Sequence, residues 1–328
     1  GMVLSENLTV RPGGGLELNL SYAHGLPNAL KDSVGSRYDA VNAGASVVTP
    51  WGFYGLNFAR STYRVGLVAA PLYPTGETQT WGLTGSQLVY GSPGLRISTT
   101  QGLTHVSNLT TVFQNLYTLT DQKYNYASIG LQISKNITAF KLSGVINAGV
   151  TYNAGLSGPI GTLTKTTPGL PTSRFRYWGL TSNWQQTLPG GWSGNLALNG
   201  QWGENTLPQN QQWVLGGYGS LTAWTPGVLV GDGGYLLRAT LQSPTWEWKG
   251  WQVSAQGFAE QGAVTNHYIP AGAAGWQMLA DVGLGFTWTS PWKTQLSLMA
   301  ARAVANKNVT ATTLGSQRAV YFVLQQPF

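Results

Sequence analysis

Apolar side chains alternate with small polar ones along almost the whole chain, and this period of two residues is the feature that most restricts the fold. Successive side chains of a β-strand point to opposite faces, so the alternation predicts strands with one apolar and one polar face. We predict an all-β protein of about fourteen strands, within a range of about fourteen to sixteen. The predicted strands cover residues 16–23, 39–49, 53–62, 78–90, 95–108, 124–135, 138–152, 174–186, 192–202, 234–242, 251–260, 277–289, 294–303 and 319–328.

The polar face of these strands carries Gly, Ser, Thr, Asn and Gln, and few charges. Charged residues make up 9% of the chain, against roughly 25% in a typical globular protein. A large soluble β-sandwich also alternates, but its exposed face would normally carry Lys, Glu and Asp. A transmembrane antiparallel β-barrel, whose polar face lines a water-filled lumen, explains the composition better. No stretch approaches the roughly 20 apolar residues of a membrane-spanning helix.

Aromatic side chains collect at the ends of the predicted strands. An amphipathic ring is stable at the depth of the lipid headgroups, so two aromatic girdles are typical of outer-membrane barrels. A carbohydrate-binding surface is the alternative, but it gives no reason to place rings at both ends. The residues concerned are Trp51, Tyr54, Tyr63, Trp81, Tyr90, Trp184, Trp192, Trp202, Trp288 and Trp292.

The connections between strands differ in length. Tight turns at residues 91–94 and 189–191 contrast with long segments at 154–173 and 203–233. Short turns on one rim and long loops on the other are typical of barrels in the outer membrane of bacteria. We therefore expect residues 1–328 to form a single outer-membrane barrel domain that contacts outer-membrane lipid.

Charge and cysteine content narrow the possible partners. The net charge is +7, but the 18 Lys and Arg are scattered singly, which argues against a nucleic-acid partner. The chain has no cysteine, so disulfides and thiolate metal sites are excluded. The first residues are not a signal peptide. Since an exported protein needs one, we expect the sequence to be a mature or shortened form of a longer precursor.

The C-terminal residues resemble the signature by which bacterial outer-membrane proteins are recognised for insertion. Phe328 is the last residue, and Val320, Phe322 and Leu324 precede it on one strand face. Pro327 is unusual in such a signature. The resemblance implies that the barrel-assembly machinery is a partner, with Phe328 as the insertion signal.

Residues 213–241, which read WVLGGYGSLTAWTPGVLVGDGGYLLRATL, resemble the barrel of two-partner-secretion transporters. This is the haemolysin-activator and filamentous-haemagglutinin-exporter branch of the Omp85 superfamily. Its members carry L-G-G-x-x-S-V-R-G-[FY] on a long loop that folds into the pore, followed by G-D-x-G. The residues that match or stand at motif positions are Gly216, Gly217, Ser220, Leu221, Thr222, Ala223, Trp224, Gly231, Asp232 and Gly234.

The strands after the loop extend the resemblance. Arg238 lies in a strand similar to the family's Y-L-L-R, and Phe258, Glu260 and Gly262 resemble its F-x-D-x-G. The resemblance implies that residues 203–233 form the in-folded loop and that these strands form its wall partners. Family barrels have sixteen strands, five of them after the loop. This chain also shows five after the loop but about nine before it, and it lacks the POTRA domains, so we expect a shortened or diverged member.

One departure concerns the loop tip. The family's V-R-G-[FY] is replaced by Leu221-Thr222-Ala223-Trp224. In the family the arginine pairs with the acid of F-x-D-x-G, a charge-assisted contact that holds the loop in the lumen. Thr222 cannot make that contact, so we expect Glu260 to need another partner or water and the loop to sit differently.

No catalytic, cofactor-binding or metal-binding arrangement stands out. His24, His105 and His267 lie far apart in sequence and are best explained as solvated side chains. Asp232 with Glu247, or Glu260 with Asp281, could form carboxylate pairs, but lumenal carboxylates satisfied by Arg and Lys are the simpler explanation. The glycines at 216–219 are not a phosphate loop, because no Lys-Ser/Thr follows. An outer-membrane lipase or protease is the least favoured reading.

Two functions of different classes remain. The first is a pore that moves a large unfolded partner protein to the cell surface, with no cofactor and no enzymatic step. The second is a passive diffusion porin for small solutes, in which the same long loop narrows the channel. The missing loop arginine and the missing POTRA domains favour the porin, whereas the ordered series of motifs favours the secretion pore.

Overall fold

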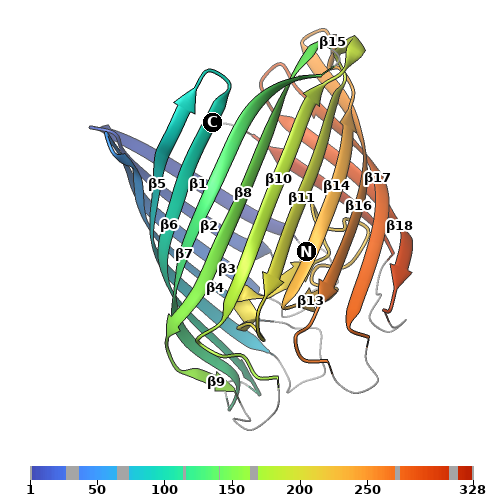
Figure 1. Ribbon diagram of the computed structural model, residues 1–328. Helices are drawn as coiled ribbons and strands as arrows, with labels where there is room; N and C mark the ends of the chain where they lie inside the picture. The colour runs from blue at the N-terminus through green and yellow to red at the C-terminus, as the bar shows by residue number, and fades with distance from the viewer. Residues whose placement is uncertain are drawn as a thin grey trace.

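The computed structural model describes residues 2–26, 37–64, 74–113, 116–139, 141–162, 169–269, 274–309 and 317–326. These residues form one antiparallel sheet of 17 strands and a separate two-stranded ladder (Figure 1). Two members of the large sheet have only three residues, which leaves fifteen long strands. The large sheet contains β1 (Met2–Gly13), β2 (Leu16–Leu26), β3 (Arg37–Thr49), β4 (Gly52–Arg64), β5 (Thr75–Ser92), β6 (Leu95–Val112), β7 (Tyr117–Ala139), β8 (Leu142–Ser157), β9 (Ile160–Thr162), β10 (Arg176–Thr187), β11 (Ser193–Gly203), β14 (Gly233–Gln242), β15 (Trp246–Trp248), β16 (Trp251–Thr265), β17 (Trp276–Thr289), β18 (Gln295–Lys307) and β19 (Arg318–Gln325).

The all-β antiparallel fold predicted from the alternation is confirmed, with one strand more than the fourteen predicted segments. The additional strand is β1, which pairs with β2 through contacts such as Leu8 opposite Leu20. The sequence analysis missed it because Glu6 interrupts the apolar face and Pro12 lies near its end. Pairing with β2 holds these residues in a strand although their local alternation is weak.

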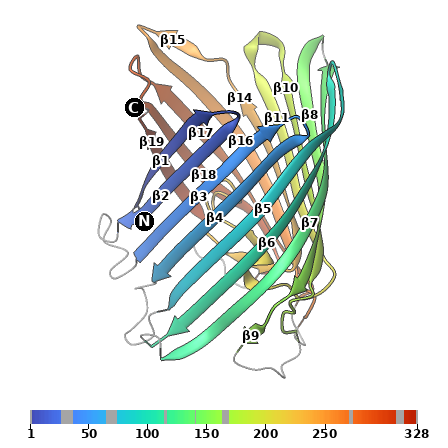
Figure 2. The ribbon, with the colours of Figure 1, turned by 90° about the vertical axis from the view of Figure 1, so that its left-hand side faces the viewer.

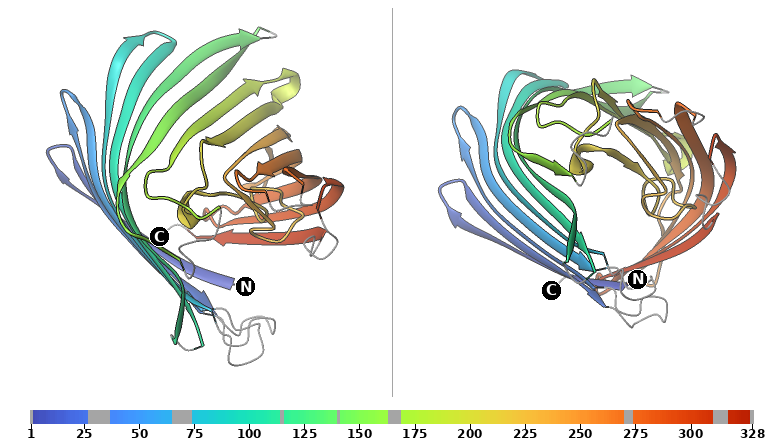
Figure 3. Two further views of the ribbon diagram at one scale, coloured as in Figure 1. Left: turned by 60° about the horizontal axis from the view of Figure 1, so that its bottom comes forward. Right: turned by 90° about the horizontal axis from the view of Figure 1, so that it is seen from below.

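Each long strand pairs with the next along the chain, and the sheet curls round until its first and last strands approach each other (Figure 3). Strand directions alternate, so β1 and β19, the first and fifteenth long strands, run in the same direction. No backbone pairing joins β1 to β19 in the part of the chain that the structure describes. The curled sheet is a barrel with a seam between its two edge strands.

The two ends of the barrel differ (Figures 1 and 2). One end, the short-turn rim, carries the connections at residues 14–15, 50–51, 93–94, 188–192, 243–250 and 290–294. The other end, the long-loop rim, carries the connections that begin after β8 and β11. Tight turns therefore predominate at the short-turn rim, as the sequence indicates, although β6 and β7 also return through a short connection, 113–116, at the long-loop rim.

The outer face of the sheet is apolar and exposed. Leu83, Ile129, Leu284 and Phe322 lie on it and are 56%, 62%, 63% and 64% exposed. A band of large exposed apolar side chains suits contact with lipid rather than water. No helix among the described residues is long and apolar enough to span a membrane.

The buried core lies inside the barrel, where the segment between β11 and β14 packs against the inner face of the sheet (Figure 3). One apolar cluster joins this segment to β14, β16, β17 and β18, and a second joins its beginning to β6 and β7. The inner face is otherwise polar. The fold thus places one long connection in the space that the strands enclose.

Candidate functional site

Residues 204–232 leave the sheet at the long-loop rim and form a compact loop inside the barrel. Its base is a short ladder between β12 (Trp213–Leu215) and β13 (Leu229–Gly231), and its tip comprises residues 216–228. The helical turn η2 (Gln209–Gln211) precedes the ladder. The ladder brings both ends of the tip together, so the tip projects as a unit.

Backbone hydrogen bonds within the loop shape the tip. The Gly216 N–H donates to the carbonyl of Ser220 at 2.8 Å, and the Gly217 N–H donates to the carbonyl of Trp224 at 3.0 Å. Gly216 has a φ of 109°, and a Cβ there would collide with the carbonyl of Thr225. Only glycine fits this backbone, so the predicted glycine pair is needed for the shape of the tip.

Two backbone amides of the tip bind two carboxylates of the barrel wall. The Thr222 N–H donates to Glu260 Oε2 at 2.7 Å, and the Ala223 N–H donates to Asp281 Oδ2 at 2.8 Å. Glu260 on β16 and Asp281 on β17 are cross-strand neighbours. Hydrogen bonds to charged acceptors are shorter and stronger than neutral ones. We call these two contacts the latch.

Arg238 completes the charge balance of the latch from the wall itself. It lies opposite Glu260 on β14, with its Nη1 atom 3.1 Å from Glu260 Oε1, and its guanidinium stands 4.9 Å from the ring centre of Phe258. The Glu260 side chain is fully buried, so this cation offsets part of the cost of burying its charge. Glu260 therefore has two partners, and the side chain of Thr222 is not one of them.

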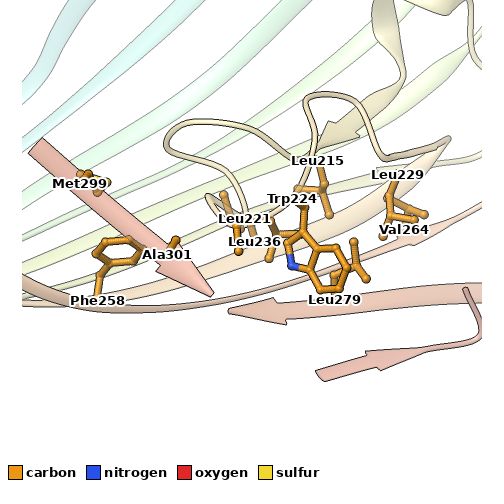
Figure 4. Packing of buried hydrophobic residues seen from close by; sticks show 11 residues of the cluster. Leu215, Leu221, Trp224, Leu229, Leu236, Phe258, Val264, Leu279, Met299 and Ala301 are labelled. Atoms are coloured by element: carbon orange, nitrogen blue, oxygen red, sulfur yellow. The ribbon is translucent and has the colours of Figure 1, made fainter. Parts of the chain in front are cut away.

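Apolar packing surrounds the latch (Figure 4). Trp224 and Leu221 are buried and belong to one cluster with Leu279 and Phe258 on the wall. Gly262 lies beneath the loop, where a Cβ would stand 2.8 Å from Leu215 Cδ1. The indole of Trp224 thus fills the aromatic position of the motif by packing against the inner face of the barrel.

Asp232 fixes the root of the loop. Its Oδ1 accepts the Leu207 N–H and its Oδ2 accepts the His267 N–H, both at 2.8 Å. The side chain is 4% exposed. At Gly234, a Cβ would collide with Trp213 and with the carbonyl of Ala263. The G-D-x-G element therefore ties the two ends of the loop to the start of β14.

The first part of the loop reaches the opposite wall. Gln211 donates to the Tyr124 hydroxyl at 3.1 Å and accepts from the Tyr177 hydroxyl at 2.8 Å. The Gln209 N–H donates to Gln122 Oε1 at 3.2 Å. Because β7 and β10 carry these partners and β16 and β17 carry the latch, the loop crosses the interior from wall to wall.

Several polar atoms at the tip have no protein partner within the described part of the chain, among them Ser220 Oγ, Thr222 Oγ1 and Trp224 Nε1. Buried polar groups of this kind are commonly satisfied by water. No cluster of three or more metal-ligating side chains occurs among the described residues.

The structure brings most of the predicted motif residues together, and it adds partners that the sequence did not single out. Glu260, Arg238 and Phe258 meet at the tip, while Gly231, Asp232 and Gly234 meet at the root. Phe328 lies outside the described residues, so the insertion signal stays a prediction. The partners not singled out are Tyr124, Gln122 and Gln211, whereas Asp281 was considered only as a possible carboxylate pair with Glu260, which is its cross-strand neighbour.

Removing the wall cation should weaken the latch. We expect Arg238→Ala to leave the buried Glu260 and its neighbour Asp281 without a counter-charge, which costs about 3 kcal/mol in comparable buried pairs. The open fraction of single channels in planar bilayers should therefore rise. Adding Thr222→Arg to Arg238→Ala moves a guanidinium to the family's loop position and should restore the closed state.

Arg60→Ala is the matched control, because Arg60 pairs with Glu77 at 3.0 Å outside the loop. It should leave the open fraction unchanged. If Arg238→Ala and Arg60→Ala behave alike, the cation has no part in holding the loop.

The comparisons with known proteins agree with this geometry. The family model of haemolysin secretion/activation proteins, ShlB/FhaC/HecB, matches residues 17–288, which is most of the chain. The chain belongs to this family. It is a family of outer-membrane transporters within the Omp85 superfamily and not of enzymes, so the resemblance inferred from the loop motif is confirmed.

Curated relatives are distant in sequence. The heme/hemopexin transporter protein HuxB of Haemophilus influenzae is 26% identical over 194 residues, which cover 56% of this chain and 33% of that protein. The chain thus matches about a third of the length of its relative.

Solved structures share the fold. CdiB from Escherichia coli superposes with a TM-score of 0.82 at 18% identity, covering 98% of this chain and 59% of that one. CdiB from Acinetobacter baumannii gives 0.71 at 16% identity, with the same coverage. BamA from Haemophilus ducreyi gives 0.56 at 12% identity, covering 98% of this chain and 70% of that one. At these identities the likeness concerns the fold alone.

Proposed function

We propose that this chain is the barrel of an outer-membrane pore that exports a large unfolded partner protein to the cell surface. The observation that carries the proposal is the latch, which holds a removable loop across the interior of a barrel from a secretion family. Residues 1–328 act as one domain, and residues 203–233 act as its plug. Release of the tip opens a path along the strands while Asp232 keeps the root attached.

The lining of the barrel suits an extended polypeptide. Gln132, Asn147, Asn183 and Asn199 line one polar groove of about 490 Å³ on β7, β8, β10 and β11. Amide side chains both donate and accept hydrogen bonds, so they match the backbone of an unfolded chain without fixing one sequence. The cargo binds weakly and slides, and its folding outside the cell supplies the driving force.

The partners follow from the same proposal. The exported protein is one whose folded form is too wide for the barrel, and the HuxB relative, by its name, handles heme and hemopexin. Insertion into the membrane proceeds through the barrel-assembly machinery and the C-terminal strand with Phe328. Outer-membrane lipid surrounds the apolar band.

A reversible lock tests whether the loop must move. The chain has no cysteine, so Leu215→Cys with Gly262→Cys creates a single disulfide between loop and wall. We expect the oxidised double variant to stop the export of a partner protein produced in the same cells, and dithiothreitol to restore it. The assay is immunodetection of that protein in the medium of cells carrying the complete transporter.

The single variant Leu215→Cys is the control and should export under both conditions. Equal export by the locked and reduced double variants contradicts a mobile plug. If neither exports a protein while small sugars enter proteoliposomes at the same rate in both states, the chain is a diffusion porin.

A further inference from the structure

A dense group of tryptophans lies on the outer face at the short-turn rim, far from the latch. Five of the 14 tryptophans of the chain lie here, and they are Trp246 and Trp248 on β15, Trp251 on β16, Trp288 on β17 and Trp292 in the turn after β17. β15 marks this place at the upper edge of the barrel (Figures 1 and 2). Trp248 and Trp292 are 70% and 64% exposed. An aromatic girdle accounts for scattered single rings, but not for this concentration.

The rings border a groove of about 580 Å³, which we call the rim groove. Its lining residues are Trp251, Trp288, Ser290, Trp292, Thr294 and Leu296. Trp251 and Trp292 meet edge to face, with ring centres 5.8 Å apart and planes at 62°. The rim groove is therefore a shaped concavity with packed aromatic walls.

The floor of the rim groove continues toward the middle of the membrane. Trp288 lies opposite Leu296 in the β17–β18 ladder, and Phe286 stacks on Trp288 with ring centres 5.8 Å apart. Leu284 and Leu298 follow on the same outer face. An apolar track of this kind matches the length and chemistry of an acyl chain.

Two lysines belong to the turns that border the rim groove. Lys249 belongs to the turn between β15 and β16, and Lys293 belongs to the turn between β17 and β18. The two turns touch, because a Cβ at Gly250 would lie 3.2 Å from Pro291 Cγ. The Lys249 ammonium lies 5.1 Å from the ring centre of Trp248. Two cations thus stand beside one apolar groove at headgroup depth.

The nearest acid does not neutralise this pair of lysines. Glu247 lies opposite Gln252 and accepts its side-chain amide at 2.8 Å. Trp246, Trp248 and Trp251 alternate with these two residues and so occupy the other face of the hairpin. The outer face at the rim groove therefore carries positive charge.

We propose that the rim groove is a binding site for one phospholipid with an anionic headgroup, in the leaflet at the short-turn rim. One acyl chain follows Trp288, Phe286 and Leu284, and the headgroup phosphate binds Lys249 and Lys293. The lysine ammonium groups attract an anionic headgroup, and the amphipathic tryptophans pack against the glycerol region of the lipid. The site fixes this edge of the barrel at a defined depth.

Native mass spectrometry of the complete, delipidated protein titrated with phosphatidylglycerol or phosphatidylcholine tests the site. We expect one tightly held phosphatidylglycerol and no comparable phosphatidylcholine. Lys249→Gln with Lys293→Gln should weaken that binding about thirtyfold, since each lysine near an anionic headgroup strengthens binding about fivefold. Trp292→Ala should weaken both lipids together.

Lys141→Gln is the matched control, because Lys141 has a similar positive φ of 59° but lies in the turn between β7 and β8, which does not border the rim groove. It should bind phosphatidylglycerol as the unaltered protein does. Equal binding of the two lipids, or unchanged binding by the double lysine variant, overturns the proposal. Displacement of the lipid by millimolar inorganic phosphate shows a free-phosphate site instead, and it overturns the lipid assignment.

Discussion

Glu260→Ala combined with Asp281→Ala should open the pore. The double substitution removes both acceptors of the latch and leaves the buried Thr222 and Ala223 amides without partners. Each bond to a charged acceptor contributes about 1.5–3 kcal/mol, so the loss of two should shift the balance toward the released loop by about a hundredfold or more. Planar-bilayer recordings should show a steadily open channel.

The matched control for the open channel is Glu247→Ala. This glutamate lies at the short-turn rim and binds Gln252, away from the loop tip. It should leave the conductance unchanged. A double variant that folds, as shown by its resistance to unfolding in detergent at room temperature, yet stays closed would contradict the latch.

Asp232→Ala should release the root of the loop. The carboxylate accepts two backbone N–H groups, from Leu207 and His267, and it is buried. A buried donor left without an acceptor costs about 1–3 kcal/mol, so two such losses should destabilise this region by about 2–6 kcal/mol. Chymotrypsin should then cut after Trp213, which is partly buried at the base of the loop in the intact protein.

Asp232→Asn provides the graded comparison. An amide keeps one acceptor oxygen of the two, so cleavage should be slower than in Asp232→Ala and faster than in the unaltered protein. Equal protection of all three proteins would show that the root is held by packing alone.

The two sets of contacts divide the work of the loop. Glu260 and Asp281 hold the tip through two backbone amides, whereas Asp232 holds the root to β14 and to the connection after β16. A loop with a strong root and a separable tip can swing aside without losing its attachment. This division explains why the tip and root variants should differ in conductance and in the position of cleavage.

The fold could be predicted from the sequence because successive residues of a strand lie on opposite faces of the sheet, so their alternation shows in the sequence. Residues 280–288 alternate without interruption, and β17 covers them. β1 was missed since Glu6 falls on its apolar face, and only its pairing with β2 shows that residues 2–13 belong to the sheet. Local pattern therefore sufficed wherever a strand had an uninterrupted lipid-facing side.

The motif glycines, Asp232 and Glu260 were likewise identified from the sequence motif. The groups that they bind were not. From the sequence we expected Glu260 to lack the cationic partner that the family has, because Thr222 stands at the position of the family's arginine. The structure resolves it with a backbone amide from the loop and with Arg238 from the neighbouring strand.

The sequence by itself determined the β-barrel class, the polar interior and the identity of the long loop, because each depends on periodicity or on a contiguous motif. Tertiary structure alone decided which groups hold that loop. Glu260 and Asp281 lie 38 and 58 residues from the amides they bind, and strand register brings them side by side. Every residue except proline has a backbone N–H, so no pattern of side chains could have predicted which backbone amides form the latch.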